Sequence, residues 1–151
     1  MNNCNQHSKC INSALEHAQS LCNQKKILFT SLRKNILEII WQSHIPLKAY
    51  DLLERLQKKD SSAKPITVYR TLDFLLLHNL IHKLESQNTY FGCTHPGDIH
   101  NCYFLICKKC NQVEEGCEHN LLKKIYETLK ESNFIVDHAV LEIKGICKSC
   151  Q

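Results

Sequence analysis

The chain has 151 residues, of which 43% are hydrophobic and 7% aromatic, and it carries a formal net charge of +4. This length suits one domain or two small ones with a modest core. No apolar run approaches the ~18 residues of a membrane-spanning helix, and the polar start Met1-Asn-Asn-Cys-Asn-Gln-His7 lacks the order of a signal peptide, so a cytosolic protein without membrane contact is expected. In a reducing compartment, ten cysteines that include Cys-x-x-Cys pairs indicate metal rather than disulfides.

Positive charge is concentrated in the N-terminal half. Between Lys25 and Glu85, eleven Lys and Arg residues stand against six Asp and Glu, whereas residues 86–151 carry seven against eight. This excess could meet a phosphate backbone, although an ordinary solvated helical surface would have the same charge.

Apolar spacing and capping residues predict four helices in this half. They cover residues 11–26, a segment capped by Thr30 that ends before Ile45-Pro46, residues 47–56, and residues 65–78, which begin at a proline. Two short extended runs, 81–85 and 89–93, follow as a hairpin. Helices followed by a hairpin describe a winged helix-turn-helix, whose last helix enters the major groove; a small α+β domain without nucleic acid is the alternative. On that helix, Tyr69 and Arg70 suit phosphate and base contacts.

The second half is predicted to be a small, strand-rich α+β domain. Strands are expected at 103–107, 112–115, 134–136 and 139–143, with one helix over 121–131. Exposed strand edges could pair with a second copy. Between the halves, residues 93–100 combine metal-capable side chains with turn formers and are interpreted as a hinge.

Two Cys-x-x-Cys pairs lie almost forty residues apart, Cys107-Lys-Lys-Cys110 and Cys147-Lys-Ser-Cys150. Four thiolates so arranged can close a tetrahedral zinc site.

From Leu28 to Cys150 the chain resembles the ferric uptake regulator family, and within it the zinc uptake regulators. The strings that carry the resemblance are Ala49-Tyr-Asp-Leu-Leu, Ala63-Lys-Pro-Ile-Thr-Val-Tyr-Arg-Thr-Leu-Asp-Phe-Leu, His82-Lys-Leu-Glu-Ser, Phe104-Leu-Ile-Cys-Lys-Lys-Cys and Gly145-Ile-Cys-Lys-Ser-Cys. The resemblance implies an α+β protein with a winged-helix DNA-binding domain over 1–92, where 1–10 form a mobile tail, a hinge over 93–102, and a dimerization domain over 103–151. It implies a homodimeric repressor, without a small-molecule substrate, that binds palindromic operator DNA when regulatory zinc is bound and silences zinc-uptake genes.

The same resemblance assigns two zinc ions per chain. The structural site matches Cys107, Cys110, Cys147 and Cys150, and the regulatory site matches His82, Cys93, His100 and Glu115. The residues expected to contact DNA are Arg33, Lys64, Thr67, Tyr69 and Arg70. Taken singly, each regulatory residue has a plainer interpretation, as a surface histidine, a buried thiol, a turn residue or a solvated carboxylate.

Alternatives remain for the metal and for several cysteines. A thiolate ligand disfavours magnesium and manganese, but not cobalt or copper. The His-His-Asp-His run of many iron- and peroxide-sensing relatives is replaced here by His100-Asn-Cys-Tyr-Phe104, which disfavours iron sensing. The alternative function is an iron, manganese or peroxide/thiol sensor of the same family. Cys102 and His95 are rivals for the regulatory site. Cys117 and His119 could form an accessory one, but they are interpreted first as a loop thiol and a histidine at a helix start. Cys4 and Cys10 are interpreted as thiols on the tail, and Cys22 as a core residue. An enzyme is not expected, because four protein ligands leave zinc no open position.

Overall fold

The computed structural model describes residues 7–96, 102–117, 119–131, 134–135 and 139–151, and it divides into two compact units, 1–98 and 99–151. We call these unit 1 and unit 2 and describe each by itself. The boundary falls inside the predicted hinge, whose residues 97–101 lie outside the described ranges. None of the helices in those ranges combines the length and the apolar character that a bilayer crossing requires.

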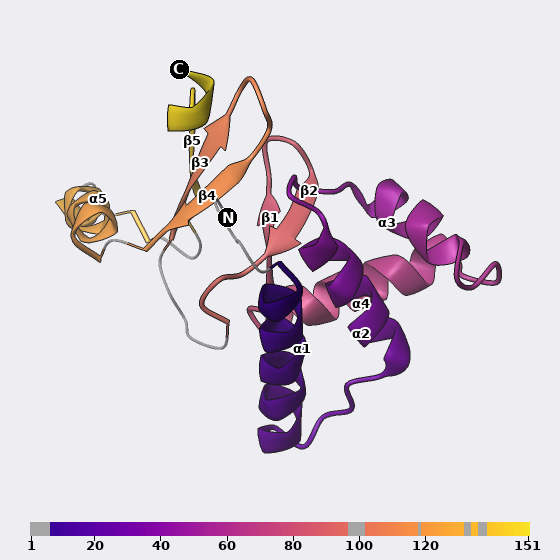
Figure 1. Ribbon diagram of the computed structural model, residues 1–151. Coiled ribbons are helices and arrows are strands. Elements are labelled where there is room, and N and C mark those ends of the chain that lie inside the picture. The colour runs from indigo at the N-terminus through magenta and orange to yellow at the C-terminus, as the bar shows by residue number, and fades with distance from the viewer. Residues whose placement is uncertain (1–6, 97–101, 118, 132–133, 136–138) are drawn as a thin grey trace. The chain divides into compact units, whose positions relative to one another are not determined.

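Unit 1 contains four helices, α1 (His7–Gln24), α2 (Ser31–Gln42), α3 (Ala49–Gln57) and α4 (Pro65–Leu77) (Figure 1). Helix α1 begins four residues before its predicted start. The reason is tertiary, because Cys10 and Ile11 pack against the core and extend the helix upstream. Cys10 is also disulfide-bonded, so its interpretation as a free thiol on a mobile tail is wrong.

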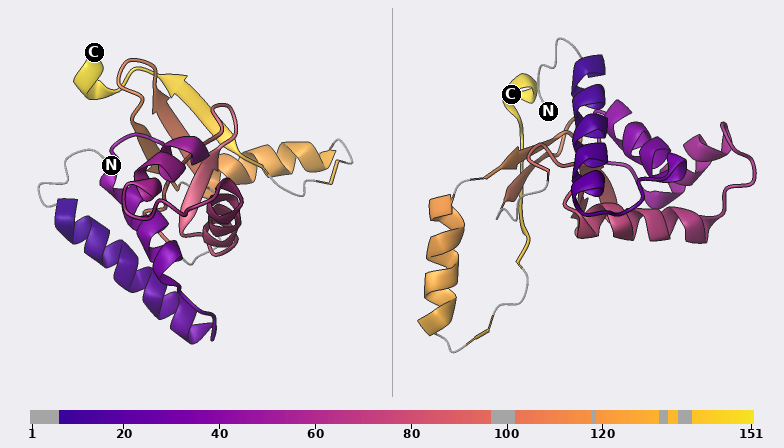
Figure 2. Two further views of the ribbon diagram at one scale, coloured as in Figure 1. Left: turned by 90° about the vertical axis from the view of Figure 1, so that its right-hand side faces the viewer. Right: turned by 90° about the horizontal axis from the view of Figure 1, so that it is seen from below.

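The other helices begin where the sequence predicts, or within two residues of that point. Thr30 is the N-cap of α2, and its side-chain oxygen accepts a hydrogen bond from the backbone N–H of Arg33 at 3.4 Å. Pro65 occupies the first position of α4. Proline is tolerated there because the backbone N–H at this position has no hydrogen-bond partner within the helix. Helix α2 contacts each of the other three helices of unit 1, and the packed helices can be followed by their colours in the two views of Figure 2. Most of the largest fully buried side chains come from α2, α3 and α4: Ile36, Leu37, Ile40, Leu52, Leu56, Val68, Leu72 and Leu75. Cys22 of α1 and Leu80, Ile81 and Leu84 at the wing are equally buried.

A two-stranded wing completes unit 1. Strands β1 (Ile81–Leu84) and β2 (Thr89–Gly92) are antiparallel, with Ile81 opposite Gly92. On its other side β2 pairs with Leu47, which exchanges two backbone hydrogen bonds with Tyr90, of 2.9 and 2.7 Å. The indole of Trp41 lies against Gly92 so closely that a Cβ there would overlap it. Hydrogen bonds and side-chain packing therefore hold the wing against the helices. The predicted winged helix-turn-helix is confirmed.

Unit 2 is built on a three-stranded sheet. Its strand order is β4 (Val113–Gly116), β3 (Tyr103–Cys107) and β5 (Leu141–Gly145), with β3 antiparallel to β4 and parallel to β5. The helix α5 (His119–Glu131) and the short 3-10 helix η1 (Lys148–Cys150) complete it. The predicted strand over 134–136 is wrong in its described part, because Phe134 and Ile135 lie outside any strand and are exposed. An apolar run becomes a strand only where a neighbour supplies the hydrogen bonds.

Candidate metal centres and nucleic-acid interface

The parallel pairing of β3 with β5 brings the two Cys-x-x-Cys pairs together. Cys107 ends β3 opposite Gly145, the last residue of β5. After β3 the chain turns at Cys110. After β5 it runs through Cys147 into η1, which ends at Cys150. Two further hydrogen bonds join the segments, from the Lys108 backbone N–H to the Gly145 carbonyl at 2.9 Å and from the Lys109 side chain to the Cys150 carbonyl at 2.8 Å.

The four sulfurs have the spacing of a zinc site. All four Sγ atoms lie within 4.8 Å of one another, and those of Cys110 and Cys147 are 3.8 Å apart. Zn–S bonds of about 2.3 Å at tetrahedral angles place neighbouring sulfurs about 3.8 Å apart. The donor set and its geometry therefore fit a zinc ion.

The local backbone favours the thiolate form of one of these cysteines, Cys107. Backbone N–H groups of Cys147 and Cys110 point at the Cys107 sulfur and lower its pKa to about 6, the first of them at 3.4 Å. Hydrogen bonds with Cys147 and Cys110 instead raise the pKa of Cys150 to about 12. One thiolate would thus be available to bind a zinc ion first, and binding of the ion would release the protons of the other thiols to solvent.

Unit 1 brings two of the predicted regulatory ligands together. His82 lies on β1 and Cys93 directly follows β2, and their ligand atoms are within 4.8 Å of each other. Cys93 is fully buried, and its backbone N–H donates to the Leu80 carbonyl at 3.2 Å. The half-buried His82 ring lies 5.4 Å from the ring of Phe91, its register partner. An imidazole and a thiol held this way suit zinc as well as a structural role.

The other two predicted regulatory ligands are placed differently. Glu115 is a half-buried residue of β4 in unit 2, and His100 lies outside the described residues. His95, a predicted rival, is exposed, and its Nδ1 lies 3.1 Å from the hydroxyl of Thr94.

Cys102 and Cys117 form a disulfide with a Cα–Cα distance of 4.3 Å. While this bond exists, Cys102 is no rival ligand for the regulatory site, and Cys117 is neither the free loop thiol that the sequence suggests nor an accessory ligand. The cause is register: Tyr103 pairs with Gly116, Cys102 directly precedes β3, and Cys117 directly follows β4. The two cysteines are equally far from the turn between β3 and β4, and this could have revealed the pair. That argument requires the ends of both strands to be known.

The exposed side of α4 carries the predicted DNA contacts. Tyr69 and Arg70 are exposed, Thr67 is half-buried, and Lys64 is the exposed N-cap residue. Two exposed apolar residues of unit 1 were missed by sequence reasoning, Ile66 on α4 and Tyr50 on α3, with 57% and 76% of their surface accessible. The signal that could have found them is an apolar residue outside the buried stripe of its helix.

Arg33 has partners inside unit 1. Its guanidinium lies 3.4 Å over the Phe74 ring, and its Nη1 donates to the Leu28 carbonyl. These contacts join the start of α2 to α4. A role in binding DNA stays a prediction for this residue.

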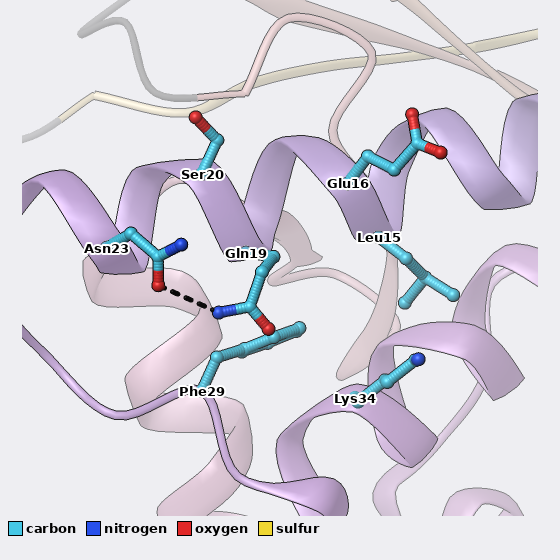
Figure 3. Close-up of a pocket in the computed structure, with 7 residues that line it drawn as sticks. All are labelled: Leu15, Glu16, Gln19, Ser20, Asn23, Phe29 and Lys34. Atoms are coloured by element: carbon cyan, nitrogen blue, oxygen red, sulfur yellow. Dashed lines mark hydrogen bonds between the residues drawn. The ribbon is translucent and has the colours of Figure 1, made fainter.

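One described pocket, of about 400 Å³, lies beside α1 (Figure 3). Within it the side-chain amide of Gln19 donates to Asn23 Oδ1 at 3.0 Å. Its lining residues are Leu15, Glu16, Gln19, Ser20, Asn23, Phe29 and Lys34. None of the predicted site residues is among them.

Comparison with known proteins gives consistent results. A sequence model of the ferric uptake regulator family matches residues 24–144. The chain is 35% identical over 138 residues to the zinc uptake regulation protein of Escherichia coli (strain K12), covering 90% of this chain and 80% of that protein. A zinc uptake regulator complexed with zinc and DNA has a TM-score of 0.88 at 33% identity, over 93% of this chain and 94% of that one. The holo form of XcZur has a TM-score of 0.85 at 33% identity, over 92% and 97%.

Proposed function

Because this chain belongs to the ferric uptake regulator family, we propose that it is a zinc-responsive transcriptional repressor that binds palindromic operator DNA as a homodimer and silences zinc-uptake genes. The observation that carries the proposal is the similarity, over nearly the whole chain, to a zinc uptake regulator complexed with zinc and DNA. The family consists of transcription regulators, so no enzymatic activity is proposed. Acting on chromosomal operators, the protein would work in the cytoplasm.

Two zinc ions per chain have different tasks in this proposal. Cys107, Cys110, Cys147 and Cys150 would hold the structural ion, which joins the β3 turn to the C-terminal segment and so stabilises unit 2.

The regulatory ion would be held by His82, Cys93, His100 and Glu115. The approach of the first two in unit 1 supports this assignment. The four ligands come from both sides of the predicted hinge, so binding all of them favours one arrangement of the units. Zinc would then change DNA affinity by selecting that arrangement.

DNA contact is assigned to α4 and the residues at its start. Arg70 can donate two hydrogen bonds to a guanine edge, and Tyr69, Thr67 and Lys64 can meet phosphates. Arg33 is the fifth proposed contact. A two-fold symmetric dimer would present two such helices to a palindrome.

Metal-dependent DNA binding tests the function directly. Duplexes selected by the protein from a random pool are titrated by fluorescence anisotropy at buffered free zinc, iron(II) or manganese(II). Zinc should raise the affinity for the duplex at a lower free metal concentration than iron(II) or manganese(II) does. Equal binding at all zinc levels, or a response to iron or manganese alone, would overturn the proposal.

Arg70→Ala tests the α4 assignment. Loss of the base contact should weaken operator binding by about 1–3 kcal/mol, while zinc content and the dimer stay intact. Arg55→Ala is the matched control, because it removes an exposed positive charge from α3. If both variants bind alike, α4 is not the recognition helix.

Cys93→Ser tests the regulatory site. The variant should keep the structural zinc, lose the second ion and lose zinc-dependent DNA binding. Cys22→Ser is the control, because Cys22 is equally buried in unit 1 but lies on α1. A zinc response that survives in Cys93→Ser contradicts the ligand assignment.

A further inference from the structure

The outer end of the β3–β4 hairpin is closed by the Cys102–Cys117 disulfide. Beyond the last paired residues, Tyr103 and Gly116, the two cysteines lie opposite each other with their Cα atoms 4.3 Å apart. This is close to the ~4.5 Å of a non-hydrogen-bonded cross-strand pair, so the fold itself places the two sulfurs in bonding range. If they are reduced, the strands keep the thiols adjacent and ready to bond again.

The proposed zinc ligand Glu115 lies beside this bond. The Cys117 sulfur is 3.7 Å from Glu115 Oε1, and Glu115 is the second residue from the end of β4, opposite the buried Phe104. Between Glu115 and Cys117, Gly116 is covered so closely by the Tyr103 ring that a Cβ has no room. The carboxylate therefore lies on a strand end whose geometry depends on tight local packing and on the cross-link.

We propose that Cys102 and Cys117 form a reversible dithiol–disulfide site whose oxidation holds Glu115 in position and thereby makes the zinc response sensitive to the thiol redox state. The inference rests on the proposed function, because it takes Glu115 as a regulatory zinc ligand. The reactant that it requires is a low-molecular-weight disulfide.

The exchange balances in two steps. The half-buried Cys117, as thiolate, attacks one sulfur of the small disulfide, which forms a mixed disulfide and releases one small thiol. Cys102, only 8% exposed, then attacks the Cys117 sulfur, which forms the protein disulfide and releases the second small thiol. The two protein thiols lose two electrons and two protons, and the small disulfide gains both. A dithiol reductant reverses the exchange.

Oxidation should tighten regulatory zinc binding. The last residues of a strand separate readily from their neighbours, and a cross-link immediately outside Glu115 suppresses this motion. A carboxylate that is already in place binds the ion without first being ordered. Supports that orient metal ligands typically change metal affinity by about tenfold or more, so we expect about a tenfold difference between the two redox states.

The first test establishes the chemistry. The zinc-loaded full chain is incubated with glutathione disulfide or with dithiothreitol, alkylated and digested, and the peptides containing Cys102 and Cys117 are examined by mass spectrometry. They should be linked after oxidation and separately alkylated after reduction, with full return on re-oxidation. Peptides that never link, or that cannot be reduced in the folded protein, overturn the proposal.

The second test measures the consequence. The zinc affinity of the regulatory site is measured by competition with a chromophoric chelator in both redox states, and operator binding is measured alongside it. Oxidised protein should bind zinc about tenfold more tightly and bind DNA at correspondingly lower free zinc. The double variant Cys102→Ser/Cys117→Ser should have the zinc affinity of the reduced protein under both oxidising and reducing conditions. This control shows whether oxidation of any other cysteine contributes to the difference. Equal affinity in the two states, tighter binding when reduced, or a redox response that persists in the double variant overturns the inference.

The same measurement separates the two proposals. A zinc-dependent DNA response that is equal in both redox states defeats only the redox inference. DNA binding that ignores zinc in both redox states defeats the proposed function.

Discussion

The two units are stabilised by different physical means. The largest fully buried side chains among the described residues all belong to unit 1, where Ile36, Leu52 and Leu72 are completely or almost completely shielded from solvent. In unit 2 the described buried residues are few: Cys102, Phe104, Ile106, Cys107 and Val113. Two of these five are cysteines, and they belong to the disulfide and to the four-sulfur cluster. Unit 1 is therefore held mainly by apolar burial, whereas unit 2 depends on sulfur chemistry.

The largest effect should come from breaking the four-sulfur cluster. Cys147→Ser removes one thiolate, and a structural zinc site contributes about 10 kcal/mol or more to folding, so unit 2 should unfold. Hydrogen exchange should show lost protection in β3 and β5, with unchanged protection in α2 and α4. Ser149→Ala, an exposed change between Cys147 and Cys150, is the control. Full protection of β3 and β5 in zinc-free Cys147→Ser would refute the contrast between the units.

The complementary change removes apolar volume from unit 1. Leu72 is completely buried on α4, and Leu72→Ala should lower the free energy of unfolding by about 2–5 kcal/mol, from lost transfer energy and the cavity left behind. Leu77→Ala is the matched control, because Leu77 lies on the same helix with 76% of its surface exposed, and it should change stability by less than about 0.5 kcal/mol. Guanidinium denaturation followed through Trp41 measures both. Equal effects would show that burial does not stabilise unit 1 as proposed.

A smaller effect should come from adding one methyl group under the wing. Gly92→Ala places a Cβ into the Trp41 indole, and overpacking of this kind destabilises by about 1–3 kcal/mol. Gly145→Ala in unit 2 has no atom within 4 Å of the added Cβ and should leave stability unchanged or slightly improved. Thermal unfolding of the two variants gives the comparison. A neutral Gly92→Ala would mean that the wing is not packed against α2.

The smallest expected effect is a pH dependence of unit 1. His78 follows α4, its ring stacks edge-on against Phe74 at 4.5 Å, and burial lowers its pKa below the usual 6.5. The unfolded chain binds the proton more readily, so the contribution to stability is complete above pH 6.5 and is lost as pH falls through the lowered pKa. The effect should be small, because the ring is only partly buried. His78→Gln should remove this part of the pH profile between pH 7 and 5, and an unchanged profile would assign it to other groups.

Sequence reasoning succeeded where the signal is local. Thr30 and Pro65 determine helix starts through groups within one turn, and apolar residues at three- and four-residue spacing identify the inner faces of α2 to α4. The four-sulfur cluster could likewise be predicted, because two Cys-x-x-Cys pairs have few other uses in a reducing compartment. The strand predicted at Phe134 and Ile135 failed, because apolar composition does not supply a pairing partner.

The sequence by itself determined the residue types of both candidate metal sites, the order of helices and wing, and the family resemblance, because each depends on neighbours in the chain. Only the tertiary structure decided that the α1 helix extends back through Cys10 and that Cys102 is bonded to Cys117 rather than available to metal. These features depend on strand register and helix packing, which bring together residues far apart in sequence. A shift of one residue between β3 and β4 would move Cys102 away from Cys117, and no local pattern specifies that alignment.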